Sequence, residues 1–229
     1  MKISLNWLKN YINLDDVSVD EVVHKLTVSG LEVEEVTDYN KIYDNFVVGF
    51  VKERKKHPNA DKLSLCVVND GNNDLPVVCG APNVEAGQKI VFAKIDAVVP
   101  NGGFKITKAK IRGEVSNGMI CSERELGISD NHDGIMVLDS NAESGTPIAK
   151  YLGLDDVVIE ISITPNRSDA LSHIGAARDL ASILGKDLKI PEVKLQESNE
   201  NANELAAIEI KNPDGCARYI GKIITDVKV

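Results

Sequence analysis

The sequence predicts an α+β multidomain chain, in which a small antiparallel β-barrel is inserted into a small, mainly helical domain and a third domain begins after it. Between residues 46 and 138, short apolar runs of strand type alternate with turns rich in Gly, Pro, Asn and Asp. This spacing is typical of a small β-barrel or sandwich. The flanks, residues 1–38 and 151–190, carry helical patterns, and neither is large enough to be stable alone. We therefore expect both flanks to fold together, since domain termini commonly lie close enough to tolerate an insertion.

The first flank is expected to open with a helix over residues 4–12, capped by Ser4. A second helix follows the capping box formed by Ser18 and Glu21. Residues 31–39, rich in Val and Glu, are expected to connect this helix to the barrel.

The barrel domain is expected over residues 39–150. Its strands are predicted from apolar runs at residues 46–51, 63–68 and 89–93, and a closing strand is expected at residues 134–138. Turn-forming sequences separate these runs.

After the barrel, strict alternation over residues 156–164 predicts a strand with one buried face. A helix over residues 169–184 follows, and Gly185 ends it. Residues 191–204 are polar and acidic, as expected of a linker. Residues 205–229 resemble a strand hairpin that stops within its pattern, so we expect the chain to be the front of a longer protein.

Composition limits the classes of function. The chain has 229 residues, of which 43% are hydrophobic and 27% charged, ordinary values for a globular protein. Its net charge of −9 is unlike that of a strongly basic nucleic-acid binder, so any such role must rest on local clusters. No signal peptide or run of transmembrane length is visible, so we expect a cytoplasmic protein without a membrane partner.

Motifs for metals and catalysis are absent from the sequence. There is no phosphate-binding glycine loop, no H-E-x-x-H and no G-x-S-x-G. His57 with Asp61 and His132 with Asp133 suggest catalytic pairs, but turn or strand-edge roles are favoured because no third group orients either base. The cysteines lack C-x-x-C spacing, so we expect reduced thiols, mostly in the core. The four are Cys66, Cys79, Cys121 and Cys216.

Positive charge gathers in two groups within the barrel region. One group occupies residues 52–56, and the other occupies residues 105–112. Such cations protect exposed strand edges in some proteins and follow a nucleic-acid backbone in others. Their clustering in an acidic chain slightly favours a phosphate-binding groove.

Three signatures in the barrel, at residues 57–63, 79–83 and 111–119, resemble the tRNA-binding OB-fold module of several tRNA-linked proteins. The segments at residues 2–8, 29–34 and 163–172 narrow this resemblance. Together they are similar to the N-terminal part of the bacterial phenylalanyl-tRNA synthetase beta subunit. The resemblance covers essentially the whole chain.

This resemblance implies an α2β2 enzyme that joins phenylalanine to its tRNA with ATP and magnesium, with the synthetic site in the alpha subunit. It implies that residues 205–229 begin an editing domain, and that this chain carries no catalytic residue, cofactor or metal of its own. We expect weak, charge-driven contact with tRNA. The expected tRNA-binding residues are Lys52, Arg54, Lys55, Lys56, His57, Lys62, Lys110, Arg112, Ser116 and Asn117.

Two alternatives stay open. The barrel could act as a structural or protein-interaction module with little tRNA contact, which the acidic balance and the 4% aromatic content favour. In that case Ser116 and Asn117 would be turn residues held by bonds from side chain to backbone. The chain could also be a free-standing tRNA-binding protein.

Overall fold

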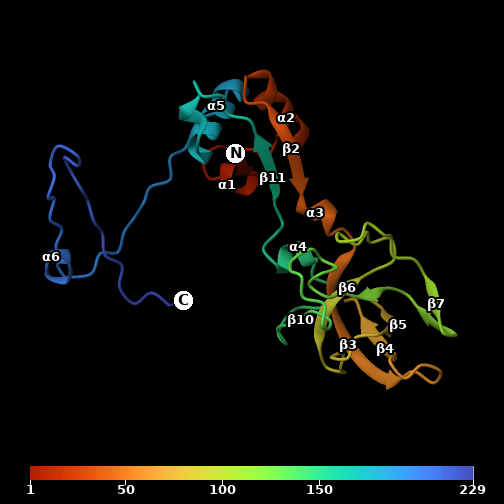
Figure 1. The fold of residues 1–229 in the computed structure, drawn as a ribbon. Coiled ribbons are helices and arrows are strands. Elements are labelled where there is room, and N and C mark those ends of the chain that lie inside the picture. Colours follow the sequence, from red (N-terminus) through yellow and green to blue (C-terminus); the bar gives the residue numbers. More distant parts are fainter. Residues whose placement is uncertain (229) are drawn as a thin grey trace. The chain divides into compact units, whose positions relative to one another are not determined.

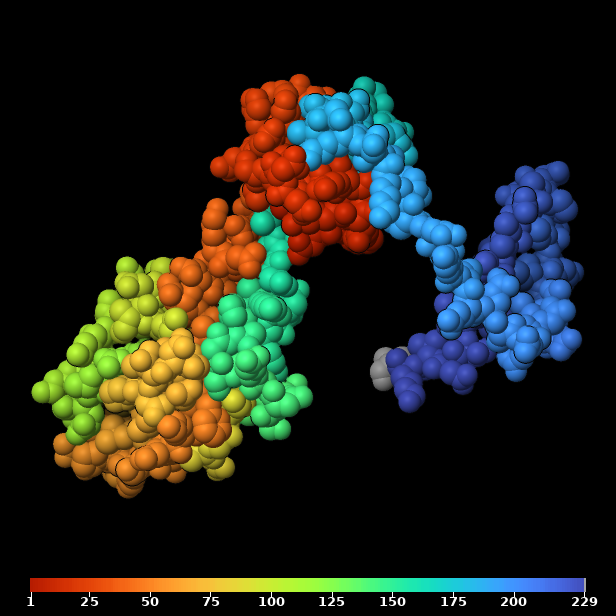
Figure 2. All heavy atoms as spheres, turned by 180° about the vertical axis from the view of Figure 1, so that it is seen from behind, coloured from red at the N-terminus to blue at the C-terminus, as the bar shows by residue number. Residues whose placement is uncertain are grey.

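The computed structural model describes residues 1–228, which divide into two compact units, Met1–Ile190 and the residues from Pro191 onward. Within the first unit, apolar side chains gather in separate cores. One core joins residues before Val33 to residues after Val157, and the others lie among residues 39–154. The first residues of the chain and the segment that ends near Ile190 lie against each other in Figure 2, in red and light blue.

A three-stranded antiparallel sheet joins the two flanks of the barrel (Figure 1). Its order is β1 (Lys2–Ser4), β11 (Val157–Ile161) and β2 (Val33–Asp38). The predicted strand after the barrel is therefore confirmed as β11. Residues 31–39, expected as a connector, instead contain β2, so this part of the chain holds a sheet as well as helices. The prediction missed β2 because it is an edge strand with no buried side chain, which hides the alternation of a half-buried strand.

Three helices and one 3₁₀ turn share an apolar core with this sheet. They are α1 (Leu5–Leu8), α2 (Val19–Val28), α5 (His173–Leu184) and the single 3₁₀ turn η1 (Ser168–Ala170). The Ser4 and Ser18 hydroxyls accept the amides of Trp7 (2.9 Å) and Glu21 (3.2 Å), which confirms both predicted caps.

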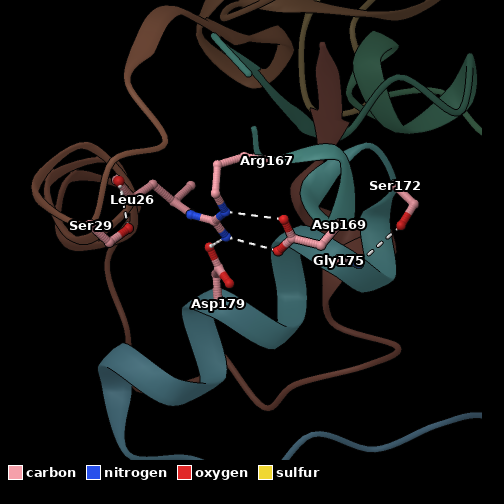
Figure 3. A network of polar contacts seen from close by, with 7 residues as sticks. All are labelled: Leu26, Ser29, Arg167, Asp169, Ser172, Gly175 and Asp179. Atoms are coloured by element: carbon pink, nitrogen blue, oxygen red, sulfur yellow. Dashed lines mark hydrogen bonds and ion pairs between the residues drawn. The ribbon is translucent and has the colours of Figure 1, made fainter. Parts of the chain in front are cut away.

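The helix predicted over residues 169–184 is α5, which begins four residues later, at His173. Ser172 accepts the Gly175 amide at 3.0 Å and so caps α5, while Asp169 lies in the preceding 3₁₀ turn. Figure 3 shows what occupies Asp169: the Arg167 guanidinium donates to both of its carboxylate oxygens, at 3.1 and 3.0 Å, and also to Asp179 on α5. This bidentate pair fixes the turn between β11 and α5.

The barrel is a nearly closed antiparallel sheet, consistent with an OB-like fold. Its path runs β10–β6–β3–β4–β5, and β9 also pairs with β6. The bounds are β3 (Phe46–Lys56), β4 (Ser64–Asn69), β5 (Asp74–Cys79), β6 (Lys89–Ala93), β9 (Met119–Ile120) and β10 (Val137–Leu138). Phe50 pairs with both β6 and β4, and a bulge between Val51 and Glu53 then shifts the register of β3 against β4. The predicted strands are confirmed, and β3 continues through the whole first basic group.

The residues around Ser116 and Gly118 close the gap between β5 and β6. The Ser116 hydroxyl accepts the Val78 amide (3.1 Å), the Asn117 amide donates to the Pro76 carbonyl (2.8 Å), and β9 then pairs with β6. Gly118 has φ +147°, and a Cβ there would lie 2.4 Å from the Phe92 ring. Only glycine fits so close to this buried ring.

Short elements complete the first unit. They are α3 (Tyr39–Ile42), α4 (Ile148–Tyr151) and the hairpin of β7 (Ala109–Ile111) and β8 (Glu114–Ser116). Cys66, Cys79 and Cys121 are free and buried, as predicted, and burial raises the pKa of Cys66 to about 11. None of the helices in residues 1–228 is long and apolar enough to cross a membrane.

The second unit contains only one short helix, α6 (Ala202–Leu205), among its described residues. The strands predicted after residue 205 are absent up to residue 228, although the turn between them is present, with the Gly215 amide donating to the Asn212 side chain at 3.2 Å. Two strands alone bury too little apolar surface to hold a hairpin in water. Residues of this unit are exposed throughout the described range.

Candidate nucleic-acid interface

The basic group on β3 is largely neutralised by neighbouring carboxylates. Lys52 lies 2.7 Å from Asp74, the first residue of β5. Lys55 lies 2.8 Å from Glu53 on its own strand. These hydrogen bonds hold the pKa values of Asp74 and Glu53 below their ordinary range.

The two remaining cations of this group also have partners. Lys56 lies 2.8 Å from Asp61, and Arg54 donates from Nε to the Ser64 hydroxyl at 3.1 Å. The four cations on β3 are therefore exposed but engaged, and three of them face an opposite charge.

The second basic group is freer. Lys105 pairs with Asp96 at 2.7 Å, whereas Lys108, Lys110 and Arg112 are exposed and form no ion pair with any residue in the described part of the chain. β7 projects from the barrel (Figure 1), so these cations lie along an open edge. We name residues 105–112 the basic strip.

The tip of the β7–β8 hairpin holds Arg112 in an uncommon conformation. Ile111 pairs with Glu114, so Arg112 and Gly113 form a two-residue turn, and both have positive φ (+51° and +101°). This is the pattern of a primed hairpin turn, in which Asn, Asp or Gly is preferred. An arginine there costs about 1–2 kcal/mol of backbone strain. Strain of this kind clusters at functional sites.

His57 links the β3–β4 loop to this hairpin. The ring is buried, and its Nδ1 accepts the Asn59 amide at 3.1 Å. The ring proton is thereby placed on Nε2, which faces the Ile111 carbonyl oxygen at 3.4 Å. His57 thus fixes the position of the hairpin tip and offers no open surface. Lys62 is exposed on the same loop.

Ser116 and Asn117 hold the barrel together. The buried Ser116 hydroxyl donates to the Gly118 carbonyl at 3.0 Å while it accepts from Val78, so its bonding is complete. Asn117 is half-buried, and its Oδ1 has no hydrogen-bond partner among residues 1–228. Of the ten predicted tRNA-binding residues, the exposed ones are the seven cations.

A cleft of about 600 Å³ opens beside the basic strip. Its walls come from parts of residues 78–82, 104–111, 116–122 and 132–135, so two of the three sequence signatures meet in it. The Phe104 ring is 48% exposed and lines the cleft. Residues 104–112 follow a turn near Pro100 and belong to the projecting rim in Figure 2, within the green range of its bar.

The sequence did not single out Phe104 or Asp133 as binding residues. A signal existed for Phe104, because it follows the turn at residues 100–103, where a side chain is expected to be exposed. The His132 Nδ1 lies 3.2 Å from the Asp130 carbonyl oxygen. Residues 1–228 also hold no group of three His, Cys, Asp or Glu side chains suited to a metal ion.

The OB-like barrel carries an open rim of cations, an arrangement that suits the backbone of a nucleic acid. Residues 46–147 match the family model described as "Putative tRNA binding domain", and this range coincides with the barrel from β3 to the start of α4. Residues 46–147, less than half of the chain, are therefore similar to the domains of that family.

Over its full length the chain is similar to phenylalanine–tRNA ligase beta subunits. It is 47% identical over 229 residues to the subunit of Syntrophus aciditrophicus and 45% identical over 230 residues to that of Fusobacterium nucleatum. The match covers 100% of this chain in both cases. It covers 28% and 29% of the two relatives, so the chain spans less than a third of their length.

Among solved structures, a MetRS-related protein from Pyrococcus horikoshii aligns with 50% of this chain and 98% of its own. The TM-score is 0.37 at 20% identity, which supports no conclusion about function.

Proposed function

We propose that this chain is part of the beta subunit of a phenylalanine–tRNA ligase, in which it binds tRNA and contributes to subunit assembly. The observation that carries this proposal is the full-length similarity to such subunits, together with a tRNA-binding domain whose rim presents unpaired cations. We infer that tRNA contact is weak and depends on charge. The principal contacts would be the cations without an ion pair among the described residues, namely Lys62, Lys108, Lys110 and Arg112. The cations on β3 would contribute less, because carboxylates face them.

The parent enzyme would pair this subunit with an alpha subunit in an α2β2 assembly and use ATP and magnesium in the cytoplasm. No group of carboxylate, histidine and cysteine side chains in residues 1–228 fits a metal ion, so we assign no step through magnesium to these residues. The editing domain would begin after a linker at residues 191–204. The separate apolar cores support a barrel at residues 39–150 inserted between residues 1–38 and 151–190.

A second candidate function is that of a structural or protein-interaction module. The ion pairs on β3 favour it, because they reduce the charge available to phosphates. A free-standing tRNA-binding protein is a weaker third candidate, since the relatives named above are much longer than this chain.

Fluorescence anisotropy of labelled tRNA at two salt concentrations tests the proposal. We expect binding at low salt that falls steeply as salt rises, because each neutralised phosphate releases counterions. A double variant Lys9→Glu/Lys189→Glu, at two exposed cations outside residues 46–147, is the control and should bind as the wild type does. Absence of binding at low salt, with retained binding to the alpha subunit, would support the structural module instead.

A further inference from the structure

We propose that the cleft beside the basic strip receives a single unstacked RNA base that carries an amino group. This inference rests on the proposed tRNA binding and deepens it. It starts from the cleft volume of about 600 Å³, which lies within the range of small-ligand sites.

The walls of the cleft suit the face of a base. Phe104 and Ile111 line it and remain 48% and 37% exposed, which leaves apolar side chains open to solvent. A Cβ at Gly102 would lie 3.1 Å from the Phe104 ring, so this glycine lets the ring rest close against the backbone. An exposed and supported aromatic ring is a stacking platform for an unpaired base.

Of the two carboxylates that line the cleft, Asp133 is the one with neither oxygen engaged among residues 1–228. Lys105 is paired with Asp96, and the Glu125 carboxylate accepts the Ser122 hydroxyl at 2.6 Å. The Asp133 carboxylate is exposed and has no hydrogen-bond or ion-pair partner among residues 1–228.

The loop that carries Asp133 is held in place from the second signature. The Asn83 side chain accepts the Ile135 amide (2.9 Å) and donates to the Ile135 carbonyl (3.0 Å). A Cβ at Gly134 would lie 2.2 Å from the Asn83 side chain, so the loop passes directly over it. Asp133 is thus a fixed acceptor at the mouth of an apolar cleft.

A carboxylate accepts hydrogen bonds from the amino groups of cytosine, adenine or guanine, whereas uracil presents carbonyl oxygens at the corresponding positions. The unpaired cations Lys108 and Arg112 flank Thr107 and Ile111, two residues of the cleft wall. They are placed to take the phosphates on either side of the inserted base. This charge pattern favours a nucleotide over a peptide segment as the occupant.

Two labelled oligonucleotides, rC8 and rU8, test the inference, since both are unstructured pyrimidine chains that differ in the amino group. We expect the 229-residue chain to bind rC8 several-fold more tightly than rU8 at low salt. Phe104→Ala should weaken rC8 binding about tenfold, the loss expected for one stacked base. Asp133→Asn should bring the rC8 and rU8 affinities together.

Matched controls are Trp7→Ala, an aromatic residue 53% exposed outside the barrel, and Asp130→Asn, an exposed carboxylate that does not line the cleft. Both should leave the preference for rC8 intact. Phe104 and Asp133 are exposed, so their variants should keep the wild-type melting temperature.

Equal affinities for rC8 and rU8, or an rC8 affinity indifferent to Phe104→Ala and Asp133→Asn, would overturn the cleft proposal. If tRNA binding stays salt-sensitive in those cases, the proposed function survives. If the wild-type chain binds neither tRNA nor oligonucleotide at low salt, both proposals fail.

Discussion

Two stretches of the barrel domain each carry four cations, yet they present different amounts of charge. On β3, residues 52–56, three of the four cations face a carboxylate, from Glu53, Asp61 or Asp74, which leaves a net charge of 4 − 3 = +1. On the basic strip, residues 105–112, four cations face only Asp96, which leaves 4 − 1 = +3. The difference teaches that a run of Lys and Arg reports available charge only once its partners in space are known.

Charge reversal on the basic strip should have the largest effect. We expect Lys108→Glu/Arg112→Glu to lower tRNA affinity roughly 10- to 100-fold and to reduce the slope of log K against log salt by about 1.5, since two phosphate contacts are lost. Lys52→Glu/Lys56→Glu makes the same change in charge on β3. Anisotropy titrations of both variants check this, and equal losses would contradict the comparison.

Replacing His57 should loosen the hairpin tip. His57→Ala removes the acceptor of the Asn59 amide and the contact to the Ile111 carbonyl, and we expect a loss of roughly 1–3 kcal/mol in the free energy of unfolding. Affinity for tRNA should fall several-fold although His57 is buried, because Arg112 lies on the loosened tip. Urea denaturation and anisotropy measure the two effects.

His57→Gln provides the matched variant, since its amide can replace part of the bonding. Partial recovery of tRNA affinity is expected. Unchanged affinity in His57→Ala, despite lower stability, would show that the tip does not need this support.

The strands and helix caps that could be predicted are those that depend on residues close to one another in the sequence. β4 and β6 have alternating or continuously buried side chains, and Ser4 and Ser18 cap helices that begin within three residues of them. Strand β2 was missed because none of its side chains is buried, so its sequence shows no alternation.

The site was less predictable from the sequence. The cations could be found in the sequence, but the register of β3, β4 and β5 decides which of them meet carboxylates. The burial of His57 and the meeting of Phe104 with Asp133 in one cleft depend on the closure of the barrel. No local pattern reports such contacts.

Removing the carboxylates that face the cations of β3 should narrow the difference in available charge between the two stretches. We expect Asp61→Asn/Asp74→Asn to raise tRNA affinity about two- to fivefold, because Lys56 and Lys52 become available to phosphates. Asp130→Asn, which removes an exposed carboxylate without freeing a cation, is the control. An equal gain in the control would mean that overall charge, and not the release of particular lysines, controls binding.

Lowering the pH from 8 to 5 should not free Lys52 from Asp74 as the Asp74→Asn change does. Lys52 and Asn69 hold the pKa of Asp74 below its ordinary value of 3.8, so the carboxylate stays ionised as pH falls from 8 to 5. The ion pair is lost only when pH falls through that lowered pKa. The gap in affinity between the Asp61→Asn/Asp74→Asn variant and the wild type should therefore be constant over pH 5–8. A gap that closes near pH 5 would contradict the assigned pairing.

The smallest expected effect concerns the strained turn at the end of the basic strip. Arg112 has φ +51°, a region that Asn adopts more readily than Arg. Arg112→Asn should therefore raise the free energy of unfolding by roughly 0.5–1 kcal/mol. The same change removes an exposed cation, so tRNA affinity should fall a few-fold.

Arg112→Lys separates these two effects, because it retains the charge and the strain. It should match the wild type in stability and nearly match it in tRNA affinity. Suppose that Arg112→Asn, but not Arg112→Lys, unfolds less readily and binds tRNA more weakly than the wild type. The turn would then retain a strained arginine because its charge is needed at the tip. If Arg112→Asn binds tRNA as the wild type does, the strain has no such role, and the available charge of the strip lies at Lys108 and Lys110.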